Sequence, residues 1–140
     1  MIGHRYVENH GEVYERLFAT LEQLLKEHVF VEFLIGRSGE FDEIAASTIK
    51  KLKKTVGNDR CFLTLVLPYP IAHLDDYWQY YDDIIFPNDD RLHYKRAIST
   101  RNEWMLTQSD LLVAYVEKEI GNAHHLLMKA KELKIPYQQV

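Results

Sequence analysis

The chain has 140 residues, 46% hydrophobic and 27% charged, which is enough for one globular domain over residues 1–140 with its own core. Seventeen basic against 21 acidic residues give a net charge of −4, which argues against non-specific binding to nucleic acid. One cysteine excludes an intrachain disulfide, no apolar run reaches the ~18 residues of a membrane span, and the first residues lack the apolar stretch of a signal peptide. We therefore expect a cytoplasmic protein without nucleic-acid or membrane partners.

Helical and strand-like patterns alternate in the first half of the chain. Apolar residues spaced by three and four predict a helix from Gly11 to His28, with Asn9 as its N-cap. The β-branched run VFVEFLI (residues 29–35) predicts a buried strand, and a second helix is expected from about 41 to 56. The run CFLTLVL (residues 61–67) predicts another buried strand, which ends before a proline.

The second half contains a long segment without a clear period. Residues 69–95 match no regular element and are rich in aromatic residues, and so long a connection is usually functional. A helix is expected from about 97 to 108 and a buried strand over 111–116. The chain then predicts a helix from 121 to about 133 and a short strand over 135–140.

Strands that alternate with helices predict parallel pairing, right-handed crossovers and helices on both faces of the sheet. We therefore expect an α/β fold: a three-layer, Rossmann-like, doubly wound sheet, mainly parallel, with about four or five strands. A helix that starts near residue 11 of such a fold normally follows a strand, but only Met1 and Ile2 precede the turn at residues 3–5. The first strand is therefore short or truncated, or another element takes its place.

Ligands of open α/β sheets bind at the carboxyl ends of the strands, so the loops after the strands should form the site. These loops contain Gly3-His4-Arg5, the stretch Gly36 to Gly39, and the stretch Glu117 to Ala123. Arg101 and Asn102 come shortly before the strand at 111–116. Glycine-rich loops and helix N-termini present main-chain N–H groups to anions, and arginine supplies positive charge. The sequence thus predicts a pocket for an anionic ligand, although it contains no P-loop motif.

The order of these motifs resembles the SLOG superfamily, whose Rossmann-like domains include the LOG phosphoribohydrolases and the DNA-processing Smf proteins. The resemblance is carried by Gly-His-Arg near the N-terminus, Gly-x-x-Gly-x-Phe-Asp-x-x-Ala, Arg-x-x-x-x-Arg-Asn-x-Trp-Met, Ser-Asp-x-x-x-Ala-Tyr and a final Gly-x-Ala. It extends from Gly3 to about Ile135 and is greatest to small bacterial members. It implies a nucleotide or nucleotide-derived ligand.

Two departures from the family pattern concern the phosphate loops. Arg37 stands where a second glycine is usual, and Gly121-Asn122-Ala123 replaces the Gly-Gly-Thr of many relatives. The Pro-Gly-Gly-x-Gly-Thr pattern of the LOG enzymes, with its downstream Glu, is absent. Since no nucleophile–base pair is visible either, we expect the protein to sense or sequester its ligand. It needs no cofactor for this role.

The predicted ligand-binding residues combine the glycine loops with nearby polar side chains. A phosphate would bind the loop amides, with Arg5 and Arg101 as counter-charges, and Asp42 would accept a hydrogen bond from a ribose hydroxyl. The full set is His4, Arg5, Gly36, Arg37, Ser38, Gly39, Asp42, Arg101, Asn102, Gly121, Asn122 and Ala123.

Each assignment has a structural alternative. His4 could contact the ligand or act as an acid or base, or could be a turn residue that bonds to the backbone. Arg5 and Arg101 could form salt bridges to carboxylates instead. Asp42 lies in the first turn of a helix, where an acidic residue also serves as a cap. Gly121 could mark a simple turn.

Tyr77 and Trp78 are the candidate base-stacking residues, because aromatic side chains stack on bases. The same aromatic segment could instead pack against a second subunit of a homo-oligomer. The acidic residues around it would repel phosphate, so the phosphate should lie on the arginine side. The cluster of Lys50, Lys51, Lys53 and Lys54 is expected to be a solvated helix face.

Two other functions remain open. The rival enzymatic function is a hydrolase or transferase that cleaves the N-glycosidic bond of nucleoside monophosphates or related nucleotides, with Glu40, Glu43 or Glu117 as the candidate carboxylate. A third possibility is an assembly module with an empty crevice. No metal site is expected, since the adjacent His124 and His125 diverge by about 100° on a helix and no His-x-x-x-His pair occurs.

Overall fold

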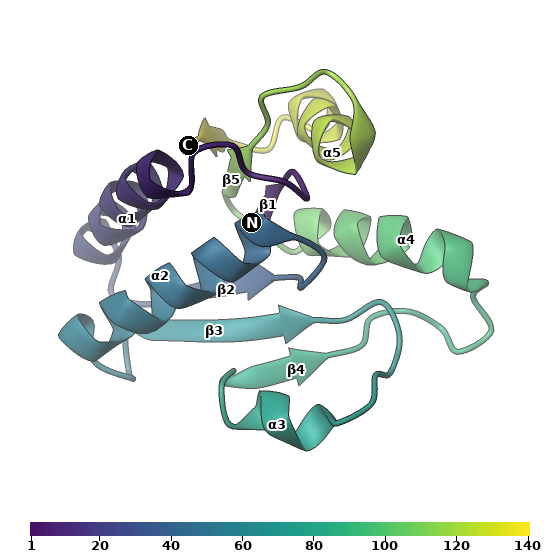
Figure 1. Cartoon of the computed structure of the whole chain (residues 1–140), viewed down its shortest axis with the longest axis horizontal. Helices are drawn as coiled ribbons and strands as arrows, with labels where there is room; N and C mark the ends of the chain where they lie inside the picture. The colour runs from purple at the N-terminus through teal and green to yellow at the C-terminus, as the bar shows by residue number, and fades with distance from the viewer.

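The computed structural model describes all 140 residues and shows the α/β fold (Figure 1). Helices and strands alternate along the whole chain. In order they are β1 (Ile2–Gly3), α1 (His10–Glu27), β2 (Val31–Ile35), α2 (Glu40–Val56), β3 (Cys61–Val66), α3 (Leu74–Trp78), β4 (Asp83–Ile85), α4 (Tyr94–Thr107), β5 (Leu112–Tyr115), α5 (Gly121–Glu132) and β6 (Tyr137–Gln139). None of the helices is both long and apolar enough to cross a membrane.

Every strand pair is parallel, and the strands form two three-stranded sheets, β1-β5-β6 and β2-β3-β4. The Met1 amino group donates to the Leu34 carbonyl oxygen at 2.7 Å, which links β1 to β2. The chain therefore winds outward from β1 in two directions, through β2, β3 and β4 on one side and through β5 and β6 on the other. This is the doubly wound, Rossmann-like arrangement, and its first strand is short, with only two residues.

Strand β5 shows how helices cover both faces of the sheet. Successive side chains of a strand point to opposite faces. Val113 and Tyr115 belong to the main core, together with buried residues of α1 and α2. Leu112 and Ala114 belong to a second core with α4 and α5. The helices thus lie in two layers around the strands, as Figure 1 shows. Burial on both faces explains why this strand is an unbroken apolar run.

The prediction that residues 69–95 contain no regular element is wrong, because they form α3 and β4. Strand β4 is parallel to β3 and brings the strand total to six. The sequence did not predict this strand because two aspartates, Asp82 just before it and Asp83 as its first residue, interrupt the apolar pattern. The Asp82 carboxylate accepts from the Leu63 main-chain N–H at 2.7 Å and forms an ion pair with Lys53, which is only 8% exposed. The prediction of a solvated face is therefore wrong for Lys53, because its side chain is buried against Asp82.

Candidate functional site

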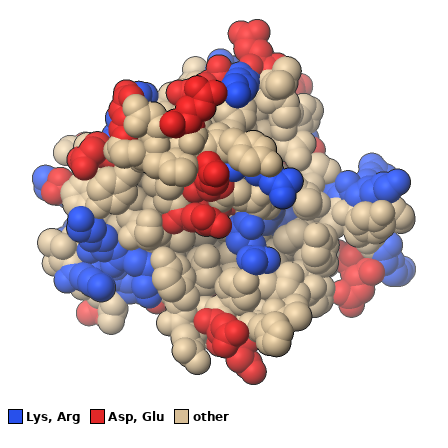
Figure 2. All heavy atoms as spheres, in the orientation of Figure 1, with Lys and Arg blue, Asp and Glu red and all other residues tan.

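A cavity of about 670 Å³ lies at the carboxyl ends of the strands. It is formed by the segments that follow β1, β2, β3 and β5 and by one face of α4. All twelve residues that the sequence analysis expected to bind the phosphate and ribose, from His4 to Ala123, line this cavity, whereas the two expected base-stacking residues do not. On the face seen in Figure 2, basic and acidic side chains lie side by side near the middle. The topology therefore brings together residues that are up to about 120 positions apart in the chain.

Two glycines allow close packing at the floor of the cavity. A Cβ atom on Gly39 would lie 2.5 Å from the Arg5 Cα atom, and the main chains are tied there because Glu40 N donates to the Arg5 carbonyl at 2.9 Å. A Cβ atom on Gly36 would lie 2.9 Å from Nη1 of Arg101 and 3.2 Å from Oδ2 of Asp42. Only glycine leaves room for these approaches.

Arg101 is almost completely buried, with 1% of its surface exposed, and reaches from α4 to the ends of β2 and β3. Its guanidinium donates to the Val66 carbonyl at 2.5 Å, to the Ser38 hydroxyl at 3.1 Å and to the Asn102 side chain at 2.7 Å. Burial lowers the pKa of Arg101 and the charge of Asp42 raises it. Arg101 forms no salt bridge, and three of its five N–H groups donate to these acceptors.

Asp42 lies in the first turn of α2, beside the Arg101 charge. Its Oδ2 atom accepts from the Ser38 main-chain N–H at 2.7 Å. Burial raises the pKa of the Asp42 carboxyl above its usual value, while the Ser38 hydrogen bond and the charge of Arg101 lower it. Asp42 thus bonds to the residue before the N-cap and caps no N–H group of the helix itself, and its second carboxylate oxygen has no hydrogen-bond partner in the protein.

His4 lines the cavity and also bonds to the backbone. Its Nε2 atom accepts from the main-chain N–H groups of Glu117 and Lys118, each at 3.0 Å. Burial is the main cause that lowers the pKa of His4, and the charge of Lys118 lowers it further. The backbone-bonded alternative is therefore the one that the structure shows, and His4 fixes the loop between β5 and α5.

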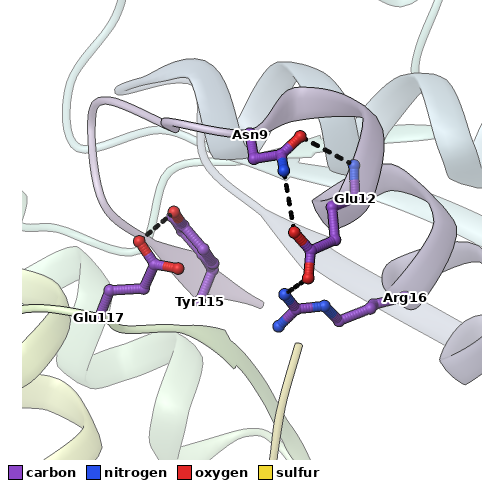
Figure 3. Close-up of polar contacts among 5 residues, drawn as sticks. All are labelled: Asn9, Glu12, Arg16, Tyr115 and Glu117. Atoms are coloured by element: carbon purple, nitrogen blue, oxygen red, sulfur yellow. Dashed lines mark hydrogen bonds and ion pairs between the residues drawn. The ribbon is translucent and has the colours of Figure 1, made fainter.

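The two long helices that begin at the cavity lack side-chain caps. At Gly39, before α2, and at Ile120, before α5, no side chain accepts from the first turn. By contrast, Asn9 caps α1 (Figure 3) and His93 caps α4. Gly121 opens α5 with φ of +85°, in the left-handed region that favours glycine. The Glu40 N–H of α2 already donates to the Arg5 carbonyl, so the remaining first-turn N–H groups of α2 and α5 are those from which an anion in the cavity could accept.

Two exposed cationic side chains of the lining have no carboxylate partner. Arg5 is exposed and forms no salt bridge. Arg37 is also exposed and stacks over the Tyr77 ring, with 5.0 Å between the guanidinium carbon and the ring centre. Lys118, in contrast, pairs with Glu8 at 3.3 Å. Arg5 and Arg37 are therefore the charges available to a ligand.

The three candidate carboxylates lie in different places. Glu117 lines the cavity, and its Oε2 atom accepts from the hydroxyl of the buried Tyr115 at 2.6 Å (Figure 3). Burial and this hydrogen bond raise the pKa of Tyr115 to about 12, so it remains a donor. Glu40 and Glu43 do not line the cavity. Glu40 instead binds the Val7 N–H at 2.7 Å and His10 at 2.9 Å, which lowers its pKa.

The structure places Tyr77 and Trp78 outside the cavity lining, where Tyr77 packs on the core cluster around Leu65. Tyr6 and Tyr69 line the cavity instead and are 73% and 43% exposed. Sequence reasoning missed both rings. Tyr69 could have been found by its place two residues after a predicted strand, at the edge where ligands bind.

Fold and cavity together define a Rossmann-like α/β domain with a polar site at the point where the strand order reverses. No group of three or more His, Cys, Asp or Glu side chains is arranged to hold a metal ion. No model of a known protein family matches the chain, and a search of curated proteins returns no match.

Proposed function

We propose that the protein binds a nucleotide or nucleotide-derived small molecule in this cavity and serves to sense or sequester it. The observation that carries the proposal is the pair of helix N-termini without side-chain caps, α2 and α5, that open into one cavity beside the unpaired Arg5. Helix N-termini bind phosphate groups through their free N–H groups, and arginine adds a directional positive charge.

The remaining lining suits the other parts of a nucleotide. The free oxygen of Asp42 can accept from a ribose hydroxyl near the cavity floor. Tyr6 and Tyr69 offer exposed aromatic faces on which a base could stack. Tyr69 therefore takes the role for which Tyr77 and Trp78 were the candidates in the sequence.

Replacing Arg5 with alanine is the direct test. The loss of a charged hydrogen bond to phosphate costs about 1.5–3 kcal/mol, so AMP should bind R5A about ten- to a hundredfold more weakly in calorimetry. The matched control is R16A, because Arg16 pairs with Glu12 on α1 and does not line the cavity. Equal affinity of R5A and wild type would refute the phosphate site. A thermal-shift screen in which no nucleoside monophosphate stabilises the protein would favour an assembly module.

A second candidate function is supported by the contact between Tyr115 and Glu117. The Glu117 carboxylate lines the cavity and accepts from the buried Tyr115 hydroxyl at 2.6 Å, which supports a role as the acid–base group of an enzyme that cleaves N-glycosidic bonds. Hydrolysis would add water across the bond between sugar and base, giving the free base and the sugar phosphate.

Chromatography after incubation with nucleoside monophosphates distinguishes binding from turnover. If the protein is an enzyme, free base accumulates with wild type, and E117Q loses at least about a hundredfold of this activity, since acid–base groups contribute about 10²–10⁴ in rate. E40Q is the control, because Glu40 does not line the cavity. Intact nucleotide after long incubation supports sensing or sequestration.

The family, the cellular location and the oligomeric state of the protein are part of the same proposal. The motif that contains Arg101-Asn102 and the final Gly-x-Ala support a small bacterial member of the SLOG superfamily that works in the cytoplasm. The exposed rings of Trp78, Tyr80 and Phe86, around α3 and β4, support assembly into a homo-oligomer, because aromatic residues are enriched at interfaces.

A further inference from the structure

Two consecutive main-chain N–H groups of the loop between β5 and α5 share one acceptor, the Nε2 atom of His4. The donors are Glu117 N and Lys118 N, each at 3.0 Å, and neither has a main-chain acceptor. His4 itself is anchored to β5, since its N–H donates to the Tyr115 carbonyl at 3.1 Å. The imidazole therefore holds the first residues of the loop against the end of β1.

This arrangement requires a lone pair on Nε2 and hence a neutral imidazole with its proton on Nδ1. Protonation would place an N–H between two other N–H groups, and both hydrogen bonds would be lost. The imidazole faces the charged groups Lys118 and Glu117 of the loop and His124 of α5, and the Tyr115 ring lies edge-on at 6.0 Å. Lys118 and His124 oppose a positive charge, and Glu117 favours it.

The hydrogen bonds that His4 accepts make the stability of the folded protein depend on pH. Burial and Lys118 lower the pKa of His4 in the folded protein below its ordinary value of 6.5. The unfolded chain therefore takes up this proton first as the pH falls. The contribution of His4 to stability is complete above about pH 6.5 and declines below it.

We propose that His4 is a positioning residue whose protonation releases the loop over residues 117–120 and thereby weakens anion binding at the N-terminus of α5. The loop leads directly into Gly121 and Asn122, which line the cavity, so the direction of their N–H groups depends on it. The effect on the ligand rests on the proposed function, whereas the response of the loop to His4 does not.

An NMR pH titration of the ligand-free protein tests the loop. In wild type, the amide resonances of Glu117 and Lys118 should shift together with the His4 imidazole signals, with one midpoint below about pH 6.5. In H4Q, whose Oε1 atom can accept in place of Nε2 but does not titrate, the two amide resonances should stay in place. The inference is overturned if His4 titrates in wild type while both amides remain unchanged, or if His4 stays neutral until the protein unfolds.

AMP binding tests the consequence for the cavity. Between about pH 7.5 and 5.5 the phosphate of AMP also takes up a proton, so the comparison is between wild type and H4Q. We expect wild type to lose about five- to tenfold more affinity than H4Q over this range. Equal losses would refute the effect on binding. If neither protein binds AMP at neutral pH, the proposed function fails, and the NMR titration still decides the role of His4.

Discussion

Replacing Arg101 with methionine should destabilise the protein by about 2–4 kcal/mol, because a buried acceptor that loses its donor costs about 1–3 kcal/mol and Arg101 serves three of them. Arg101 is 1% exposed and donates to the Val66 carbonyl, the Ser38 hydroxyl and the Asn102 side chain. Methionine fills similar space but leaves these acceptors without a donor. It also leaves the Asp42 carboxylate without its neighbouring positive charge.

Urea unfolding followed by circular dichroism measures this loss. The control is R91M, because Arg91 is exposed and its pairing with Asp89 lies at the surface, so its removal should leave the stability nearly unchanged. R101K should fall between R101M and wild type, since an ammonium group cannot span three acceptors in the way a planar guanidinium does. A stability of R101M within about 1 kcal/mol of wild type would show that the network does not hold the strands together.

A double-mutant cycle separates charge from hydrogen bonding at this position. If the Asp42 carboxylate destabilises the folded protein when Arg101 is replaced, D42N should lower the free energy of unfolding less in the R101M background than in wild type. The difference should exceed about 0.5 kcal/mol, because the two side chains flank the same glycine, Gly36. Strictly additive effects would mean that the charges do not interact.

The location of the site was predictable from the sequence because it depends on topology alone. Parallel strands joined by helices place every strand-to-helix loop at one edge, so Gly3-His4-Arg5, Gly36–Gly39 and Gly121–Ala123 had to meet there. The loops after β1, β2 and β5 do line one cavity. No side-chain detail was needed for this step.

The partners of individual side chains were not predictable in the same way. His4 is bound by amides 113 and 114 positions away, and a sequence pattern cannot show which nitrogen accepts from them. Strand β4 was not predicted because it has only three residues and starts with an aspartate. The preceding residue, Asp82, forms an ion pair with Lys53 of α2, which the local sequence does not show. Short strands and long-range polar contacts depend on packing that local propensity does not encode.

Replacing Gly3 with alanine should destabilise the protein at or above the upper end of the about 1–3 kcal/mol that overpacking costs. The new methyl group would overlap the Phe41 ring. This ring is fully buried and stacks on Tyr115, with ring centres 5.9 Å apart, so it has no free direction in which to move. Thermal and urea unfolding both measure the effect.

The chain supplies its own control in Gly11. A methyl group there meets no atom within 4 Å, and Gly11 lies inside α1. G11A should therefore leave stability unchanged or raise it by up to about 1 kcal/mol, because alanine favours a helix more than glycine does. A second variant tests the cause of the clash: F41A removes Cγ and Cδ1 of the ring, the two atoms nearest to the new methyl group, so G3A should destabilise the F41A protein less than wild type. If G3A is equally costly in both backgrounds, contact with the ring is not the reason that residue 3 is glycine, and the two-residue strand β1 requires it for another feature of its backbone.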